Sequence, residues 1–165
     1  SGGIPVVAVL GNYETHSSPL LWSMIFRDAG IRVLNNEAWV LGSLGLCVRG
    51  LGDSYTGQFT YVAFPPECKG LQKITVTHDP AGAFHPEVRG IVFAGHTHCG
   101  QIRIPLLGAL FVPTKAPEDA RCGLFRDERI TLFVSSGIGT SVIPIRFFAQ
   151  AQWDLITISN SLNAI

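Results

Sequence analysis

The chain has 165 residues, which is enough for one domain with a substantial buried core. Its 12 Lys and Arg residues balance 12 Asp and Glu residues, so no long-range field favours binding to nucleic acid or to an anionic membrane. Hydrophobic residues make up 47% of the chain, but no apolar run approaches the roughly 18 residues of a membrane span.

The amino terminus and the cysteines give two further expectations. Ser1-Gly2-Gly3 is typical of residues left after removal of an expression tag, so we expect a single domain over residues 4–165. Four cysteines are widely spaced along the chain: Cys47, Cys68, Cys99 and Cys122. Without a Cys-x-x-Cys pair they indicate neither a zinc ribbon nor a thioredoxin-like site. We expect free thiols in a reducing compartment, with disulfides as the alternative in an exported protein.

Hydrophobic patterning predicts an α/β succession of elements. Residues 4–10 form a continuous apolar, β-branched run that ends at a glycine, as buried parallel strands do. Residues 19–30 begin with a proline and end with a glycine, which predicts a helix. Further strands are predicted at residues 31–34, 38–41, 46–51, 74–77, 91–94, 130–134 and 155–158, the second and third of them as a hairpin. Residues 113–126 are the most loop-like stretch.

Two histidines directly follow the strand predicted at residues 91–94. Residues i and i+2 of an extended segment point to the same side, so His96 and His98 can reach a common site, and Gly95 lets the backbone approach closely. Neutral imidazole binds zinc, iron and similar ions, and open α/β sheets hold ligands at the carboxyl ends of their strands. The pattern therefore indicates a metal site, with ordinary polar histidines as the alternative.

Three segments after predicted strands carry the motifs of a known family: Gly11-Asn12-Tyr13-Glu14, Thr77-His78-Asp79-Pro80 and Gly95-His96-Thr97-His98-Cys99-Gly100-Gln101. Their order resembles that of the calcineurin-like metallophosphoesterases, whose signatures are Gly-Asn-His-Asp/Glu, a lone His after a strand, and Gly-His-x-His. The Gly-His-Thr-His-x-Gly-Gln-Ile string, with residues 134–139 and 144–146, resembles one bacterial branch of that family. The resemblance covers roughly residues 6–158.

The resemblance implies a fold and a set of metal ligands. The fold would be an α/β sandwich of mixed sheets flanked by helices. Asn12, His78 and His96 would be ligands of one divalent ion (Mn, Zn, Fe or Mg), and His98 would bind a second ion. In such two-metal sites the cations bind phosphate oxygens, activate water and stabilise the leaving oxygen, which is the chemistry of phosphoester hydrolysis.

The chain departs from the family pattern in two ways. Family members carry Asp-x-His and Gly-Asp-x-x-Asp motifs before the Gly-Asn-His segment, and no such motifs precede Asn12. We therefore interpret the chain as the carboxyl-terminal portion of the fold, with amino-terminal strands missing and at most one ion bound. Asp53 does not replace these ligands and is better interpreted as a turn residue.

The second departure is Tyr13, which stands where the family has a catalytic histidine. A phenol with an unperturbed pKa of about 10 is a poorer proton donor near neutral pH than an imidazole. Glu14 could orient that donor.

Other candidate residues are supported more weakly. Arg103 and Arg146 are candidates for substrate binding, because a guanidinium can bind two phosphate oxygens; a structural ion pair is the alternative. Cys99 follows His98 and is interpreted as a small buried residue rather than a soft ligand. His16 and His85 match no motif and are interpreted as ordinary loop histidines.

The resemblance thus predicts a metal-dependent phosphoesterase that acts on a phosphodiester, phosphomonoester or pyrophosphate, with a lipid-linked molecule among the candidate substrates, and that is weak or inactive as this chain. The alternatives are a non-catalytic scaffold on the same fold and a protein that binds a single metal. The expected partners are a phosphorylated small molecule or a lipid-linked one, with no nucleic acid. Self-association through unpaired strand edges and peripheral membrane association are further expectations. The compartment is cytoplasmic or membrane-associated.

Overall fold

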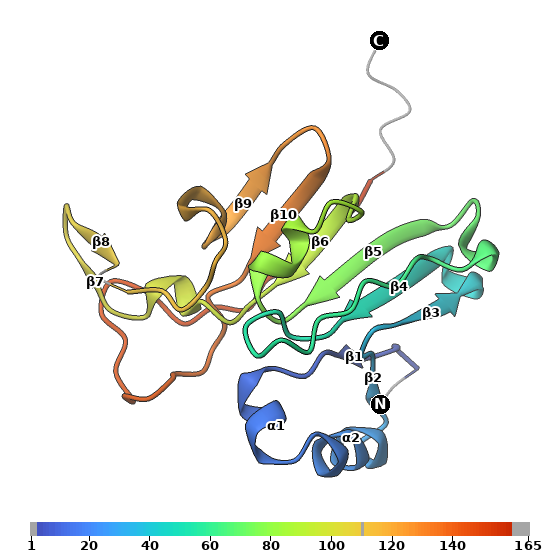
Figure 1. The fold of residues 1–165 in the computed structure, drawn as a ribbon, viewed down its shortest axis with the longest axis horizontal. Coiled ribbons are helices and arrows are strands. Elements are labelled where there is room, and N and C mark those ends of the chain that lie inside the picture. Colours follow the sequence, from blue (N-terminus) through green and yellow to red (C-terminus); the bar gives the residue numbers. More distant parts are fainter. Residues whose placement is uncertain (1–2, 110, 160–165) are drawn as a thin grey trace.

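The computed structural model describes residues 3–109 and 111–159, and its centre is one six-stranded mixed sheet (Figure 1). The strands lie in the order β3 (Glu37–Leu41), β4 (Leu46–Leu51), β5 (Gln72–Thr77), β6 (Gly90–Ala94), β10 (Ile130–Val134) and β9 (Gly123–Arg126). The four inner strands are parallel, whereas β3 and β9 pair antiparallel at the two edges. The α/β class is confirmed, and the second layer of a sandwich stays a prediction.

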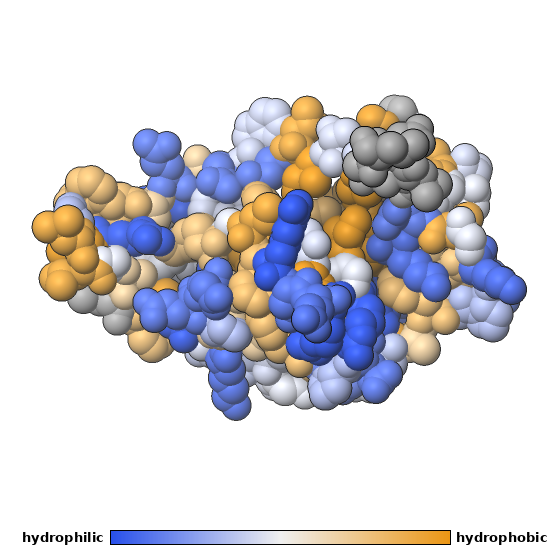
Figure 2. All heavy atoms as spheres, turned by 90° about the horizontal axis from the view of Figure 1, so that it is seen from above, coloured by the Kyte–Doolittle hydropathy of each residue, from blue (hydrophilic) through white to orange (hydrophobic). Residues whose placement is uncertain are grey.

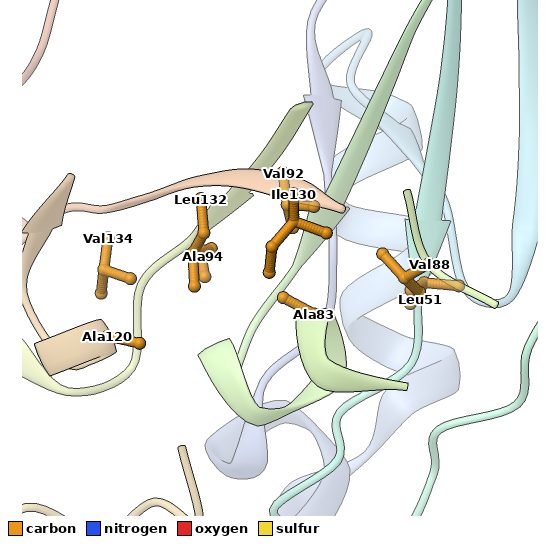
Figure 3. Close-up of a cluster of buried hydrophobic side chains, with 9 residues drawn as sticks. All are labelled: Leu51, Ala83, Val88, Val92, Ala94, Ala120, Ile130, Leu132 and Val134. Atoms are coloured by element: carbon orange, nitrogen blue, oxygen red, sulfur yellow. The ribbon is translucent and has the colours of Figure 1, made fainter. Parts of the chain in front are cut away.

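The core lies between the sheet and the short helical turn η3 (Pro80–Phe84). Its side chains are all aliphatic, most of them alanine or β-branched residues, and they gather on one face of β6 and β10 (Figure 3). The buried cluster consists of Leu51, Ala83, Val88, Val92, Ala94, Ala120, Ile130, Leu132 and Val134. Because β6 and β10 pair in register, with Val92 opposite Leu132, their side chains line the same layer.

Leu132 provides a test of this core. Its side chain is fully buried, so Leu132→Ala is expected to lower the free energy of unfolding by about 3 kcal/mol, from lost apolar transfer and the cavity left behind. Leu124, on the neighbouring strand β9, is 55% exposed, so Leu124→Ala should cost less than about 1 kcal/mol. Urea unfolding of both variants measures the difference, and equal losses would contradict the assigned core.

A smaller unit lies beside β3 and β4 in Figure 1. Its elements are β1 (Val7–Ala8), α1 (Asn12–Ser17), α2 (Pro19–Asp28) and β2 (Arg32–Val33), and β1 pairs parallel with β2. Leu34 anchors this unit, because an added Cβ at Gly50 of β4 would lie 2.3 Å from Leu34 Cβ; only glycine permits that approach. The predicted helix over residues 19–30 is confirmed and ends at Asp28.

Several sequence-based predictions of elements are wrong. The strand expected over residues 4–10 shrinks to Val7–Ala8, and α1 forms where a loop was expected. Residues 113–126 include strand β9, and residues 155–158 form no strand. The interrupted apolar stretch over residues 102–112 contributes the short hairpin β7 (Arg103–Ile104) and β8 (Gly108–Ala109). None of the helices in the described residues has both the length and the apolarity needed to cross a membrane.

The expectation of free thiols is also wrong. Cys47 is joined to Cys68, and Cys99 is joined to Cys122. The first disulfide ties the start of β4 to the turn before β5, and the second ties the segment after β6 to the start of β9. Sequence separations of 21 and 23 residues carry no pairing signal, which is why the sequence alone left both states open.

Candidate active site at the carboxyl ends of the strands

The parallel arrangement brings the predicted motifs together at one edge of the sheet. β5 and β6 are neighbours, and each is followed directly by a motif, so the backbone N–H of Gly95 donates to the carbonyl oxygen of His78 at 3.0 Å. The segment after β1 reaches the same edge and begins α1 with Asn12. Three segments far apart in the sequence therefore meet where open α/β sheets hold their ligands.

Three of the four predicted metal ligands converge on a single point. Nε2 of His78 lies 2.9 Å from Oδ1 of Asn12 and 2.9 Å from Nδ1 of His96. The two imidazole rings are tilted against each other with their centroids 4.7 Å apart. We call Asn12, His78 and His96 the ligand triad. Its three atoms are one amide oxygen and two ring nitrogens, all free of formal charge when the histidines are neutral.

A glycine makes room for this convergence, but it is not the one that the sequence indicated. A Cβ at Gly95 would have no atom within 4 Å, so the expected close approach at that residue is wrong. A Cβ at Gly11 would lie 2.5 Å from Cε1 and 2.7 Å from Nε2 of His78. The ring of His78 therefore packs directly on the Cα of Gly11, and this contact fixes the ring beside Asn12.

The environment favours the neutral form of the His78 imidazole, which metal binding requires. Burial, and after it the charge of His96, hold the pKa of His78 below its ordinary value, so the ring is neutral at neutral pH. Nε2 of His96 lies 2.7 Å from the carbonyl oxygen of Pro113, to which it must donate. In the neutral ring, Nδ1 of His96 then keeps its lone pair, which faces Nε2 of His78. Tyr55 packs on the same ring with centroids 4.8 Å apart.

His98 lies apart from the triad and contacts Arg146. Nη2 of Arg146 donates to Nδ1 of His98 at 3.1 Å and to the carbonyl oxygen of Ser136 at 2.6 Å. Burial, followed by the Arg146 charge, lowers the pKa of His98. Nη2 also lies 3.0 Å from the carbonyl oxygen of Gly137, and Nε and Nη1 donate to carbonyl oxygens of Gly139, Ala149 and Gln150. The guanidinium thus organises the segment after β10, and its contact with phosphate stays a prediction.

The two residues predicted to be catalytic flank the triad. Glu14 Oε2 accepts from the N–H of Gly11 at 2.9 Å, so its carboxylate fixes the turn that carries Asn12. Tyr13 is 56% exposed, and its hydroxyl lies 2.9 Å from Oγ of Ser141, either atom being able to donate. The phenol therefore reaches across the site to the segment after β10.

Other candidate residues lie away from the triad. Arg103 lines a separate groove with Leu106, Leu107 and Phe148, and its Nη1 donates to the carbonyl oxygen of Cys99 at 3.2 Å. Asp53 is buried and accepts from the backbone N–H groups of Tyr55 and Thr56, as expected of a turn residue. Its carboxylate is thus already engaged.

A groove of about 690 Å³ opens from the triad. His98 and Tyr13 line it, and so do residues to which the sequence assigned no role: His16, Tyr55, Gln101, Phe111, Pro113, Ser141, Val142 and Ile143. Gln101 belongs to the recognised Gly-His-Thr-His-x-Gly-Gln string, which could have drawn attention to it. His16 belongs to α1, and the others come from loops that carry no local sequence signal.

The donors of the triad fit one divalent ion. One oxygen and two imidazole nitrogens suit Zn, Fe or Mn, and the remaining positions around an ion are open to water or substrate. Among residues 3–109 and 111–159, no group of three or more His, Cys, Asp or Glu side chains could hold a metal ion. The triad is not such a group, because its third donor is the amide oxygen of Asn12. In the same part of the chain, no carboxylate completes a site for a second ion.

Curated relatives point to the same chemistry. The phosphodiesterase YaeI of Escherichia coli is 30% identical over 148 residues, which cover 82% of this chain and 52% of that protein. An uncharacterized metallophosphoesterase of Aquifex aeolicus is 27% identical over 94% of this chain and 61% of its own length. The uncharacterized metallophosphoesterase YkuE of Bacillus subtilis is 26% identical over 55% of this chain and 32% of its own length. No family model matches the chain, and no solved structure matches it.

These relatives support a metallophosphoesterase family and, with it, a hydrolase that depends on divalent metal in general. The chain spans about half the length of the curated relatives it matches.

Proposed function

We propose that this chain carries part of the active site of a metal-dependent phosphoesterase and binds one divalent ion at the ligand triad. The observation that carries the proposal is the convergence of Asn12 Oδ1 and His96 Nδ1 on His78 Nε2, both at 2.9 Å. The substrates would be phosphodiesters, phosphomonoesters or pyrophosphates, including lipid-linked ones, the classes that the family resemblance implies. The names of the relatives support this chemistry.

Each residue around the triad has a definable task. A bound divalent ion would supply Lewis-acid activation of a phosphate oxygen and of the attacking water. Asn12, His78 and His96 would hold it, while the Pro113 carbonyl keeps the proton of His96 on Nε2. Glu14 fixes the turn before Asn12, and the Tyr13 hydroxyl can donate a hydrogen bond to a phosphate oxygen. Because a phenol is a weak acid near neutral pH, we expect slow turnover.

Metal binding and hydrolysis test the proposal together. Calorimetric titration with Mn²⁺ should give about one equivalent, and bis(p-nitrophenyl) phosphate should be hydrolysed slowly in its presence. His78→Ala is expected to abolish both, because it removes the central donor of the triad. His85→Ala is the matched control, since His85 stacks on Tyr61 outside the groove and should leave both unchanged.

The outcomes separate the rival functions. Binding of one ion without hydrolysis would favour a mononuclear metal-binding protein. No binding of Mn²⁺, Zn²⁺ or Fe²⁺ by the correctly folded chain would favour a non-catalytic scaffold. Hydrolysis that survives His78→Ala would contradict the assignment of the triad.

Compartment and partners are part of the proposal. Two disulfides favour folding in an oxidising environment over a reducing one, which counts against free cytoplasmic residence and is compatible with attachment to a membrane surface. Self-association also stays a proposal: β3 and β9 are edge strands, and α2 exposes Leu20, Leu21, Met24 and Ile25.

A further inference from the structure

We infer that the groove beside the ligand triad binds the uncharged, apolar organic group of a phosphoester, and that Gln101 positions the wall that selects for it. The inference rests on the proposed phosphoesterase function and specifies its substrate. All three residues of the triad line the groove, so an ester bound there by its phosphate would place its organic group against the other lining residues.

The lining of the groove has no permanently charged side chain to offer a polar substrate. Among the described residues that line it, none is Lys, Arg, Asp or Glu. Beyond the triad and Tyr13, the walls consist mainly of apolar side chains: Tyr55, Ile102, Phe111, Pro113, Val142 and Ile143. A second phosphate or a charged base would lose its hydration in the groove without forming an ion pair, which is unfavourable. Transfer of an alkyl or aryl group from water into the groove is favourable.

One wall is an irregular segment, residues 139–146, which is nevertheless held in a defined shape. Gln101 Nε2 lies within 3.0 Å of the carbonyl oxygens of Ser141, Ile143 and Ile145, and its Oε1 accepts from Ser141 N–H at 2.6 Å. A single side-chain amide thus binds one face of the segment at four backbone atoms. The hydroxyl of Tyr13 contacts Ser141 from the opposite side of the groove.

Val142 shows that this shape is imposed by its surroundings. Its φ of 60° is unfavourable for a β-branched residue, and its side chain is 93% exposed. An apolar side chain kept in that conformation beside the triad contributes surface to the groove. Figure 2 shows that apolar side chains also gather at the end of the molecule that carries the β7–β8 hairpin, but that surface belongs to the separate groove of Arg103.

Binding of alkyl phosphates tests the inference. With Mn²⁺ present, calorimetry should show affinity rising about two- to fourfold per methylene from methyl to butyl to hexyl phosphate, because each methylene leaves water. Val142→Asn should reduce this gain while leaving methyl phosphate affinity unchanged, since asparagine tolerates positive φ but lacks the apolar surface. Ile138→Asn is the matched control: Ile138 directly precedes this segment and is 75% exposed, but it does not line the groove, so the gain should persist.

Gln101 is tested as a positioning residue in the same assay. Gln101→Ala and Gln101→Glu should both lose most of the chain-length dependence, because neither side chain can donate to the three carbonyl oxygens, and both should keep Mn²⁺ binding and methyl phosphate affinity. Far-UV circular dichroism checks that both variants are folded. Retention of the full chain-length dependence in both would overturn the role of Gln101.

The two proposals fail in different ways. Equal affinities for methyl and hexyl phosphate, with Mn²⁺ bound, would overturn the apolar subsite and leave the phosphoesterase intact. If neither Mn²⁺ nor methyl phosphate binds, 1-hexanol serves as the probe of the subsite alone. Hexanol binding that Val142→Asn weakens would then support the subsite although the metal site is wrong, and no hexanol binding would overturn both.

Discussion

Replacing Gly11 with alanine is expected to lower the affinity of the triad for Mn²⁺ by about 10- to 100-fold, the range typical of changes that displace a ligand through its immediate surroundings. The added Cβ would lie 2.5 to 2.7 Å from three atoms of the His78 ring, so the ring must move away from Asn12 and His96. The backbone itself tolerates the change, because φ and ψ of Gly11 are −105° and −169°, an extended conformation. Calorimetric titration measures the loss.

Gly95→Ala is the matched control for this prediction. Gly95 immediately precedes His96, but a Cβ there would meet no atom within 4 Å, and its φ is not positive. Metal affinity should therefore stay within about twofold of the parent chain. Because Gly11 also caps α1, a small loss of stability, about 0.5–1 kcal/mol, is expected in Gly11→Ala alone. Equal metal affinities in the two variants would show that His78 does not depend on the space at Gly11.

The sequence predicted the elements whose signals are local and strong. Strands β4, β5, β6 and β10 lie within two residues of their predicted bounds, because each is an apolar, β-branched run bounded by turn residues. The proximity of Asn12, His78 and His96 was predicted as well, since each motif lies at or shortly after the end of one of these strands or of β1; their role as metal ligands stays a prediction. Neighbouring parallel strands have their carboxyl ends at the same edge of the sheet. When the strands are predicted correctly, the residues that follow them are therefore expected to lie close together.

What the sequence missed depends on contacts between distant segments. β9 pairs with β10 across a turn in which Asp127 Oδ1 accepts from the N–H groups of Arg129 and Ile130, and the exposed, alternating sequence of β9 gives little hint of this. Residues 155–158 have a strand-like pattern, but in the described chain no strand pairs with them. A segment with a strand-like sequence pattern thus forms a strand only where a neighbouring strand pairs with it.

The same reasoning applies to the groove. Gln101 acts on carbonyl oxygens 40 to 44 residues away, and Pro113 orients His96 through a backbone atom that any residue would supply. Spacing rules identify side chains that share one element, whereas these contacts arise where the segments after β6, β8 and β10 meet. The positions of such residues follow only from the folded structure.

Removal of the Cys99–Cys122 disulfide is the second change for which we expect a large effect. With a sequence separation of 23 residues between its cysteines, the bond should stabilise the fold by about 3 kcal/mol through the entropy of the unfolded chain. It also ties down the segment that carries His96, in which His96, His98, Cys99 and Gln101 all have positive φ. Each such residue costs about 1–3 kcal/mol and persists only if its surroundings impose it. The Cys99→Ala/Cys122→Ala variant should therefore lose both stability and at least tenfold in Mn²⁺ affinity.

The other disulfide separates these two effects. Cys47–Cys68 spans 21 residues, so the Cys47→Ala/Cys68→Ala variant should lose nearly the same stability, again about 3 kcal/mol. It lies at the amino-terminal ends of β4 and β5, however, whereas the triad lies at their carboxyl ends, so Mn²⁺ affinity should not change. Urea unfolding and calorimetry on both variants give the comparison. An equal loss of metal affinity in the two would mean that general destabilisation, rather than release of the His96 segment, governs the site.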